Sequence, residues 1–173
     1  TYSIDQSNTP TTVTGNVSVA SGATLSLSGT MGGDLAVNGN FSNAGTFTNN
    51  GRLVTFGGTA AQSVTGATTF GYLTLNNALG LTLNNAVTVA NDLALTAGKV
   101  TLGSNNLTVS GSITSSATNY VVTNGAGQLR QTVGAGAILF PVGNSAYNPI
   151  TFDNTGGTSD TYGVNVLDGT YAT

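Results

Sequence analysis

Ionisable side chains are scarce in this chain, and their types limit the chemistry that it could perform. Its 173 residues include six aspartates but no glutamate, histidine or cysteine, so nucleophilic catalysis of the Ser-His-Asp kind has no base. A glycosidase needs two carboxylates facing one cleft, and only Asp153 and Asp160 are near each other in sequence. We expect these two to be solvated loop residues rather than a catalytic pair or a Ca²⁺ site. The sequence therefore predicts a protein that is not an enzyme and uses no metal or cofactor.

Positive charge is equally sparse, which restricts the partners that the chain could bind. Lys99 is the only lysine, and Arg52 and Arg130 are the only arginines. A nucleic acid would require a basic surface that these residues cannot supply. The sequence also contains neither a long apolar run nor a basic amphipathic helix, so we expect no membrane insertion.

Threonines at regular intervals are the first candidate for a binding surface. With roughly 20 residues in each turn of a repeating coil, Thr82 would align with Thr101, and Thr88 with Thr108. Outward threonines on a flat face could bind ice, although ice-binding solenoids repeat a Thr-x-Thr pair and each phrase here carries one threonine. Aligned threonines also stabilise neighbouring strands. Both interpretations stay open for these ladders.

Tyrosines are the second candidate, because an aromatic ring with a polar edge can bind a glycan. Several of them fall in the second half of the chain, which favours residues 120–171 as a glycan-binding region. The alternative is that they pack between structural elements. The tyrosines concerned are Tyr72, Tyr120, Tyr147, Tyr162 and Tyr171.

The element that must position these residues is a short phrase repeated six times between 72 and 112. Each phrase alternates aliphatic and small polar residues and ends in a turn of Asn, Asp or Gly, which is the period of a strand with one buried face. No helical pattern separates the phrases, so we predict an all-β fold, a β-solenoid or parallel β-helix with roughly three short strands per rung. The inward pairs are Leu73/Leu75, Leu81/Leu83, Val87/Val89, Leu93/Leu95, Val100/Leu102 and Leu107/Val109.

Three segments follow from this pattern. Residues 16–114 form the solenoid, and residues 115–173, with longer strands and Gly-rich loops, form a small β-rich, sandwich-like module at its end. Residues 1–15 form an N-terminal arm in which Tyr2 and Ile4 alternate before a break at Pro10. We expect this arm either to cap the first rung or to donate a strand to a neighbouring molecule.

Two expectations concern the corners and the lumen. Asn and Gly in the turns are expected to adopt the left-handed conformation that tight corners need. Phe41, Phe47 and Leu53 recur every six residues, and phenylalanines at matching rung positions are expected to stack along the lumen.

Several segments of the chain resemble known proteins. They are FSNAGTFTNNG (41–51), TFGGTAAQSVTG (55–66), the six phrases, LFPVGNSAYNPITF (139–152) and YGVNV (162–166). Over roughly residues 34–170 the chain resembles the β-solenoid segment of large repetitive surface proteins of Bacteroidota. The resemblance implies export, often by type IX secretion, and an adhesin-like or filament-like role.

These observations favour an extracellular, non-enzymatic structural protein of a bacterial cell surface, a stiff stalk or a filament subunit. The chain begins at Thr1 rather than Met, so we expect a removed signal segment or an excerpt of a longer protein. Self-association, head to tail or by strand donation, is the expected partnership. The alternatives are an adhesin that binds glycan or a host surface through the C-terminal module, and an ice-binding solenoid that uses its outward threonine ladders.

Overall fold

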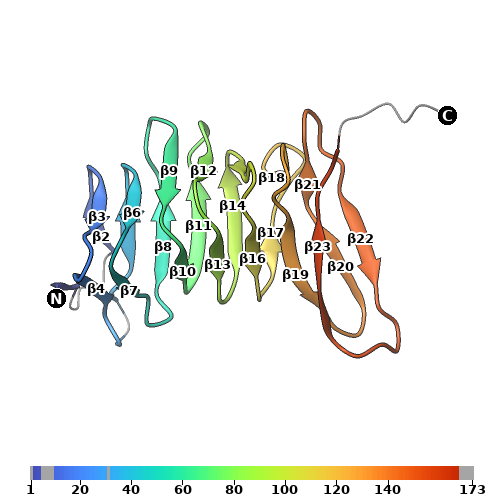
Figure 1. The fold of residues 1–173 in the computed structure, drawn as a ribbon, viewed down its shortest axis with the longest axis horizontal. Coiled ribbons are helices and arrows are strands. Elements are labelled where there is room, and N and C mark those ends of the chain that lie inside the picture. Colours follow the sequence, from blue (N-terminus) through green and yellow to red (C-terminus); the bar gives the residue numbers. More distant parts are fainter. Residues whose placement is uncertain (1, 5–9, 31, 168–173) are drawn as a thin grey trace.

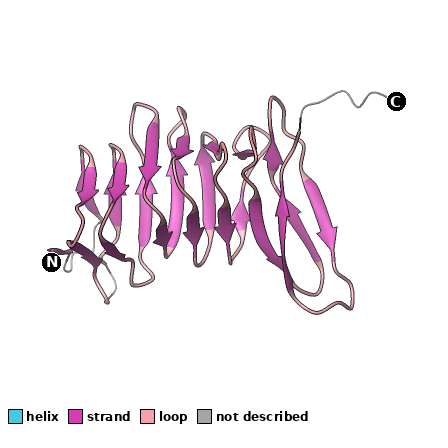
Figure 2. Ribbon diagram, in the orientation of Figure 1, coloured by secondary structure: helices cyan, strands magenta, loops and turns pink. Residues whose placement is uncertain are grey.

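The computed structural model describes residues 2–4, 10–30 and 32–167, and in these ranges the chain forms strands and no helix. The strands coil into a β-solenoid whose rungs follow one another along the long axis of the molecule (Figure 1). Colouring by secondary structure shows short strands joined by tight loops throughout the stack (Figure 2). The predicted fold class is therefore confirmed.

The solenoid has three faces built mainly from parallel strands, and successive strands along the chain fall on the three faces in turn. Face one consists of β2 (Thr11–Val13), β5 (Leu35–Val37), β8 (Leu53–Phe56), β11 (Tyr72–Asn76), β14 (Leu93–Ala97) and β17 (Ile113–Thr114). Face two consists of β3 (Val17–Val19), β6 (Phe41–Asn43), β9 (Gln62–Thr65), β12 (Leu81–Leu83), β15 (Val100–Thr101), β18 (Val121–Val122) and β21 (Val142–Gly143).

Face three is divided into two sheets. Its first part consists of β1 (Tyr2–Ile4), β4 (Thr24–Leu27) and β7 (Thr46–Thr48). Its second part consists of β10 (Thr68–Phe70), β13 (Val87–Val89), β16 (Leu107–Val109), β19 (Leu129–Val133) and β23 (Asp160–Val164), the last of which runs antiparallel.

Rung length varies along the stack. Thr11 is the partner of Leu35, 24 positions on, whereas Leu81 is the partner of Val100, 19 positions on. The repeat of roughly 20 residues expected from the six phrases is thus close to the observed one. Because strands in a sheet are about 4.8 Å apart, each rung advances the stack by that distance.

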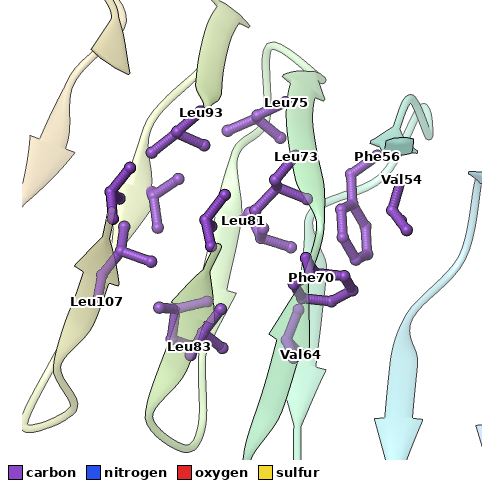
Figure 3. Packing of buried hydrophobic residues seen from close by; sticks show 14 of the residues in the cluster. Val54, Phe56, Val64, Phe70, Leu73, Leu75, Leu81, Leu83, Leu93 and Leu107 are labelled. Carbon is purple, nitrogen blue, oxygen red and sulfur yellow. The ribbon is translucent and has the colours of Figure 1, made fainter. Parts of the chain in front are cut away.

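The core is a narrow lumen filled by aliphatic side chains from all three faces. In the central strands alternation buries every second residue, and the six predicted inward pairs are all buried. Figure 3 shows these side chains in the lumen, with Leu73 and Leu93 on neighbouring strands of face one and Leu81 on face two. Burial of a leucine or valine contributes about 1.5–3 kcal/mol, so the continuous aliphatic column is the main source of stability.

The parallel stack is longer than residues 16–114 at both ends. Within the expected N-terminal arm, β1 is the partner of β4 and β2 of β5, so these strands belong to the first rungs. Beyond 114, β18, β19 and β21 continue the parallel ladders of faces two and three. The reason is that short segments such as Val121–Val122 retain the inward spacing of the repeats although their turns differ in composition.

The C-terminal end changes from parallel to antiparallel pairing. A two-stranded sheet of β20 (Ala137–Phe140) and β22 (Ile150–Asp153) lies beyond the last rungs, and β23 pairs antiparallel with β19 (Figure 1). Within the segment predicted to be a β-rich, sandwich-like module (115–173), antiparallel pairing therefore involves β20, β22 and β23, whereas β18, β19 and β21 also continue the parallel ladders. An antiparallel strand at the edge of face three ends the run of parallel rungs there.

Candidate functional site

The threonine ladders lie where the rung length places them. Thr82 is the partner of Thr101 on face two, and Thr88 is the partner of Thr108 on face three. The column on face two continues to Val122, and that on face three to Arg130. Each ladder is one threonine wide and interrupted within a few rungs, a geometry that suits cross-strand contacts between β-branched residues.

Asparagine and aspartate side chains at the corners link successive rungs, a role that the sequence alone did not indicate. The Asn40 N–H donates to Asn16 Oδ1 at 2.8 Å, and the Ser63 N–H donates to Asn40 Oδ1 at 2.9 Å. Similarly, the Gln128 N–H donates to Asn106 Oδ1 at 3.0 Å. Each such bond satisfies a backbone donor at a corner, where the strand ladder has ended.

Left-handed corners are formed mainly by glycine, which corrects the expectation for asparagine. Among the described residues, nine glycines have positive φ, whereas the only other residue with positive φ is Asn50 (φ 48°). At Gly98 (φ 88°) a Cβ would lie 1.9 Å from the Asn77 carbonyl oxygen of the rung below. Glycine therefore supplies both the conformation and the close approach, while asparagine supplies the side-chain bond.

Asp92 makes the same kind of link with a charged group. Its Oδ1 accepts the Ser112 N–H and the Ser112 hydroxyl, both at 2.8 Å. These two bonds, the backbone one foremost, lower the pKa of Asp92 below its ordinary value of 3.8. The carboxylate form is the one that holds the two rungs together at this corner.

A buried amide network crosses three rungs at the corner between faces one and two. Gln62 Nε2 donates to the Val37 and Gly39 carbonyls, and Gln62 Oε1 accepts from the Gly58 N–H at 3.0 Å. Asn77 Nδ2 donates to the same Gln62 oxygen at 3.0 Å. Both side chains are buried, and their hydrogen bonds offset the free-energy cost of removing these polar groups from water.

The described residues leave a cavity at the N-terminal end of the lumen. This cavity of about 490 Å³ is lined by side chains that include Ile4, Val13, Val17, Leu25 and Leu35. The strands β1, β2 and β3 are the last members of their sheets at this end. Of the two residues proposed for assembly, Ile4 is buried in this first rung, and the backbone of Tyr2 pairs with Leu25 within the chain.

The C-terminal aromatic residues pack against one another rather than forming an exposed platform. The Tyr120 ring is buried and its centroid lies 5.3 Å from that of Tyr147. The Tyr162 ring stacks on Phe152 at 5.1 Å, and Phe152 meets Phe140 edge to face at 5.3 Å. Tyr171 lies outside the described residues. These contacts bind the antiparallel strands to the end of the solenoid.

Acidic side chains in the described part of the chain are dispersed. No group of three or more acidic, histidine or cysteine side chains is found there. Asp153 accepts a hydrogen bond from the Thr155 hydroxyl, and Asp160 accepts one from the Thr161 N–H. Each carboxylate therefore bonds to a residue close to it in the sequence. The Lys99 ammonium donates to the Tyr120 hydroxyl at 3.0 Å.

Comparisons with protein-family models, curated proteins and solved structures find no match for this chain. None of the described segments is a helix that could span a bilayer. Function is therefore inferred from the fold and from the surfaces just described.

Proposed function

We propose that this chain is an extracellular, non-enzymatic structural protein, a stiff β-solenoid stalk or filament subunit of a bacterial cell surface. The observation that carries the proposal is the continuity of face two, whose seven strands run in one parallel ladder from β3 to β21. In such a stack each rung contacts only its neighbours, so the product is a rod whose length grows with the number of rungs.

Stiffness follows from three kinds of contact between successive rungs. Backbone ladders join the strands within each sheet, aliphatic side chains fill the lumen, and corner amides such as Asn40 and Asn106 add bonds between rungs. Bending the rod would stretch the ladders on one side and crowd the lumen on the other. An aliphatic interior is close-packed and resists such changes.

The surface composition supports a passive, extended role. Charged residues are 5% of the chain, against roughly 25% in ordinary domains, and the outward residues are mostly Thr, Ser and Asn. The resemblance to surface proteins of Bacteroidota supports export to the cell surface. Immunogold electron microscopy of the source cells, with antibody against this chain, should label extracellular projections. Labelling confined to the cell interior would refute the location.

The cavity at the N-terminal end supports head-to-tail assembly. This apolar cavity and the terminal edges of β1, β2 and β3 are what a further rung would cover. Joining two different ends is a heterologous contact, which gives an open filament rather than a closed ring. In this arrangement Ile4 and Val13 would lie in the contact, and the arm would act as the receiving edge.

One pair of variants tests this edge. The Thr11 N–H donates to the Asp34 carbonyl and the Val13 carbonyl accepts from the Asn38 N–H, so these two residues of β2 bond toward β5. Alternate residues of a parallel strand bond to opposite sides, and the Thr12 N–H therefore points to the free edge of β2. Thr12→Pro removes that donor, whereas Thr12→Ala removes only the side chain. Negative-stain microscopy should show filaments of the wild type and Thr12→Ala but not of Thr12→Pro. Equal filament lengths for all three would rule out assembly through this edge.

The two alternatives have less support. A glycan platform in the C-terminal module would need exposed aromatic rings, but Tyr120, Tyr147 and Tyr162 pack on other rings. Ice binding would need a broad threonine array, but each ladder is one residue wide.

A further inference from the structure

A surface hollow of about 460 Å³ lies at the edge of face one, where β8, β11 and β14 begin. Four of the side chains on its lining are charged or aromatic: two carboxylates, a guanidinium and a phenol. They are Asp34, Arg52, Tyr72 and Asp92, and we refer to this site as the Tyr72 hollow.

The regular stacking of the rungs brings these residues into one column. Tyr72 is the partner of Leu53, the Leu53 N–H donates to Asp34 Oδ1 at 3.0 Å, and the Leu73 N–H donates to the Asp92 carbonyl at 3.1 Å. The column therefore runs Asp34, Leu53, Tyr72, Asp92 over four successive rungs. At about 4.8 Å per rung, its ends are roughly 14 Å apart, and it lies along the outside of the rod.

Each group in the column has bonding capacity that the fold does not use. Asp34 and Asp92 link rungs through Oδ1, and within the described residues their Oδ2 atoms make no hydrogen bond. The Arg52 guanidinium makes one long contact, from Nε to the Asn50 carbonyl at 3.5 Å, and no ion pair with a described carboxylate. The Tyr72 side chain is 39% exposed although it stands at the start of a core strand.

We propose that the Tyr72 hollow binds a neutral oligosaccharide that lies along the rod. The phenol ring offers an apolar face to a sugar ring and a polar edge to solvent. Carboxylate oxygens accept hydrogen bonds from sugar hydroxyls, and the guanidinium donates to hydroxyl and ring oxygens; bonds to charged groups are the stronger ones. A ligand of several sugar units matches a column of this length.

The same residues disfavour other ligands. Two carboxylates and one guanidinium leave the column with net negative charge, which repels an acidic polymer. The carboxylates are too far apart to share a metal ion, whose ligands lie within about 2.6 Å of it. A purely structural role would need only the Oδ1 atoms, and would explain neither the exposed ring of Tyr72 nor an Arg52 guanidinium that makes no ion pair with a described carboxylate.

The test is calorimetric titration of the purified chain with a panel of neutral hexasaccharides, namely β-1,4-glucan, β-1,3-glucan, mannan and chitin oligomers, up to millimolar concentration. At least one oligomer should bind, and Tyr72→Ala and Arg52→Gln should each weaken binding about tenfold or more, which corresponds to about 1.4 kcal/mol. Tyr72→Phe should retain most of the affinity, because the ring is kept. Lys99→Gln is the matched control, since it removes the same charge at a distant corner and should leave the affinity unchanged.

Thermal melts of all variants establish that they are folded, which is expected because the substituted side chains lie on the surface. The proposal is overturned if no neutral oligomer binds the wild type, or if binding survives Tyr72→Ala in a folded variant. Binding of an oligo-arginine peptide in place of every sugar would also overturn it, because the carboxylates would then be acting as an acidic patch.

Discussion

Replacing Phe70 with alanine tests how face three is held together where its ladder is broken. Between β7 and β10 no strand pairing joins the two parts of this face. The Phe70 ring fills the gap from the lumen side and meets Phe41, Phe47 and Phe56 edge to face, at centroid distances of 5.4, 5.7 and 6.0 Å. Asn49 Nδ2 spans the gap with a bond to the Thr69 carbonyl at 3.1 Å.

The expected cost comes from burial and from these ring contacts. Phe70 is completely buried, and truncation of a buried phenylalanine costs about 3–5 kcal/mol. Loss of three edge-to-face contacts places Phe70→Ala in the upper part of that range. Phe70→Leu keeps most of the volume and should cost about 1–2 kcal/mol. Against a total stability of about 5–15 kcal/mol, the alanine variant loses a large fraction.

Urea denaturation followed by circular dichroism measures the cost, and hydrogen exchange locates it. Because rungs contact only their neighbours, Phe70→Ala should loosen β1–β7 first and leave β11–β16 protected. Val109→Ala, in the same column but in the unbroken part of face three, is the control and should not loosen β1–β7 selectively. A cost below about 1 kcal/mol, or protection lost evenly along the stack, would refute the view that Phe70 bridges the break.

Three further outcomes are expected. The pKa of Asp92 is lowered in the folded state, so its carboxylate contributes stability above pH 4 that is lost as the pH falls through the folded pKa. Asp92→Asn should therefore show a smaller drop in melting temperature between pH 7 and pH 2.5 than the wild type. An identical drop would contradict the link to Ser112. Gly98→Ala should cost at least about 2 kcal/mol in urea denaturation, whereas Gly103→Ala, at positive φ (58°) but in open space, should cost less; equal costs would exclude the contact with Asn77 as the cause. Thermal hysteresis should be absent in the wild type, because the threonine ladders are narrow. Hysteresis that disappears on substitution of the ladder threonines would instead establish ice binding. The ladder threonines are Thr82, Thr88, Thr101 and Thr108.

The packing of the phenylalanines in the lumen could not be predicted from the short sequence repeats. Phe41, Phe47 and Leu53 were expected to repeat one lumen position, but Leu53 lies on the outer side of β8, where Val54 and Phe56 are buried. The phenylalanines come from all three faces and meet edge to face rather than as a stack. Six-residue spacing places consecutive residues on different faces, and only the number of residues in each corner decides which of them meet.

The extent of the stack and the position of the aromatic residues were also decided by the tertiary structure. Strands of two residues, such as Val121–Val122, are too short to be recognised by alternation, yet they join face two because an edge strand and a lumen were already present. Tyr120 and Tyr147 pack together because the chain turns back at the C-terminal end. A tyrosine in the sequence carries no sign of whether it will be covered.

What the sequence by itself determined is the cross-section of the rod. Alternation with period two fixed which side chains face the lumen, and phrases of similar length fixed a rung near 20 residues, so that the pairing of Thr82 with Thr101 and of Thr88 with Thr108 followed. What only the tertiary structure decided is which outer residues share a column. Rungs of 19 to 24 residues differ in their corners, and a change of one corner residue moves every outer side chain relative to the next rung. The alignment of Asp34, Tyr72 and Asp92 beside Arg52 depends on those corner lengths, and it exists only once the chain is coiled.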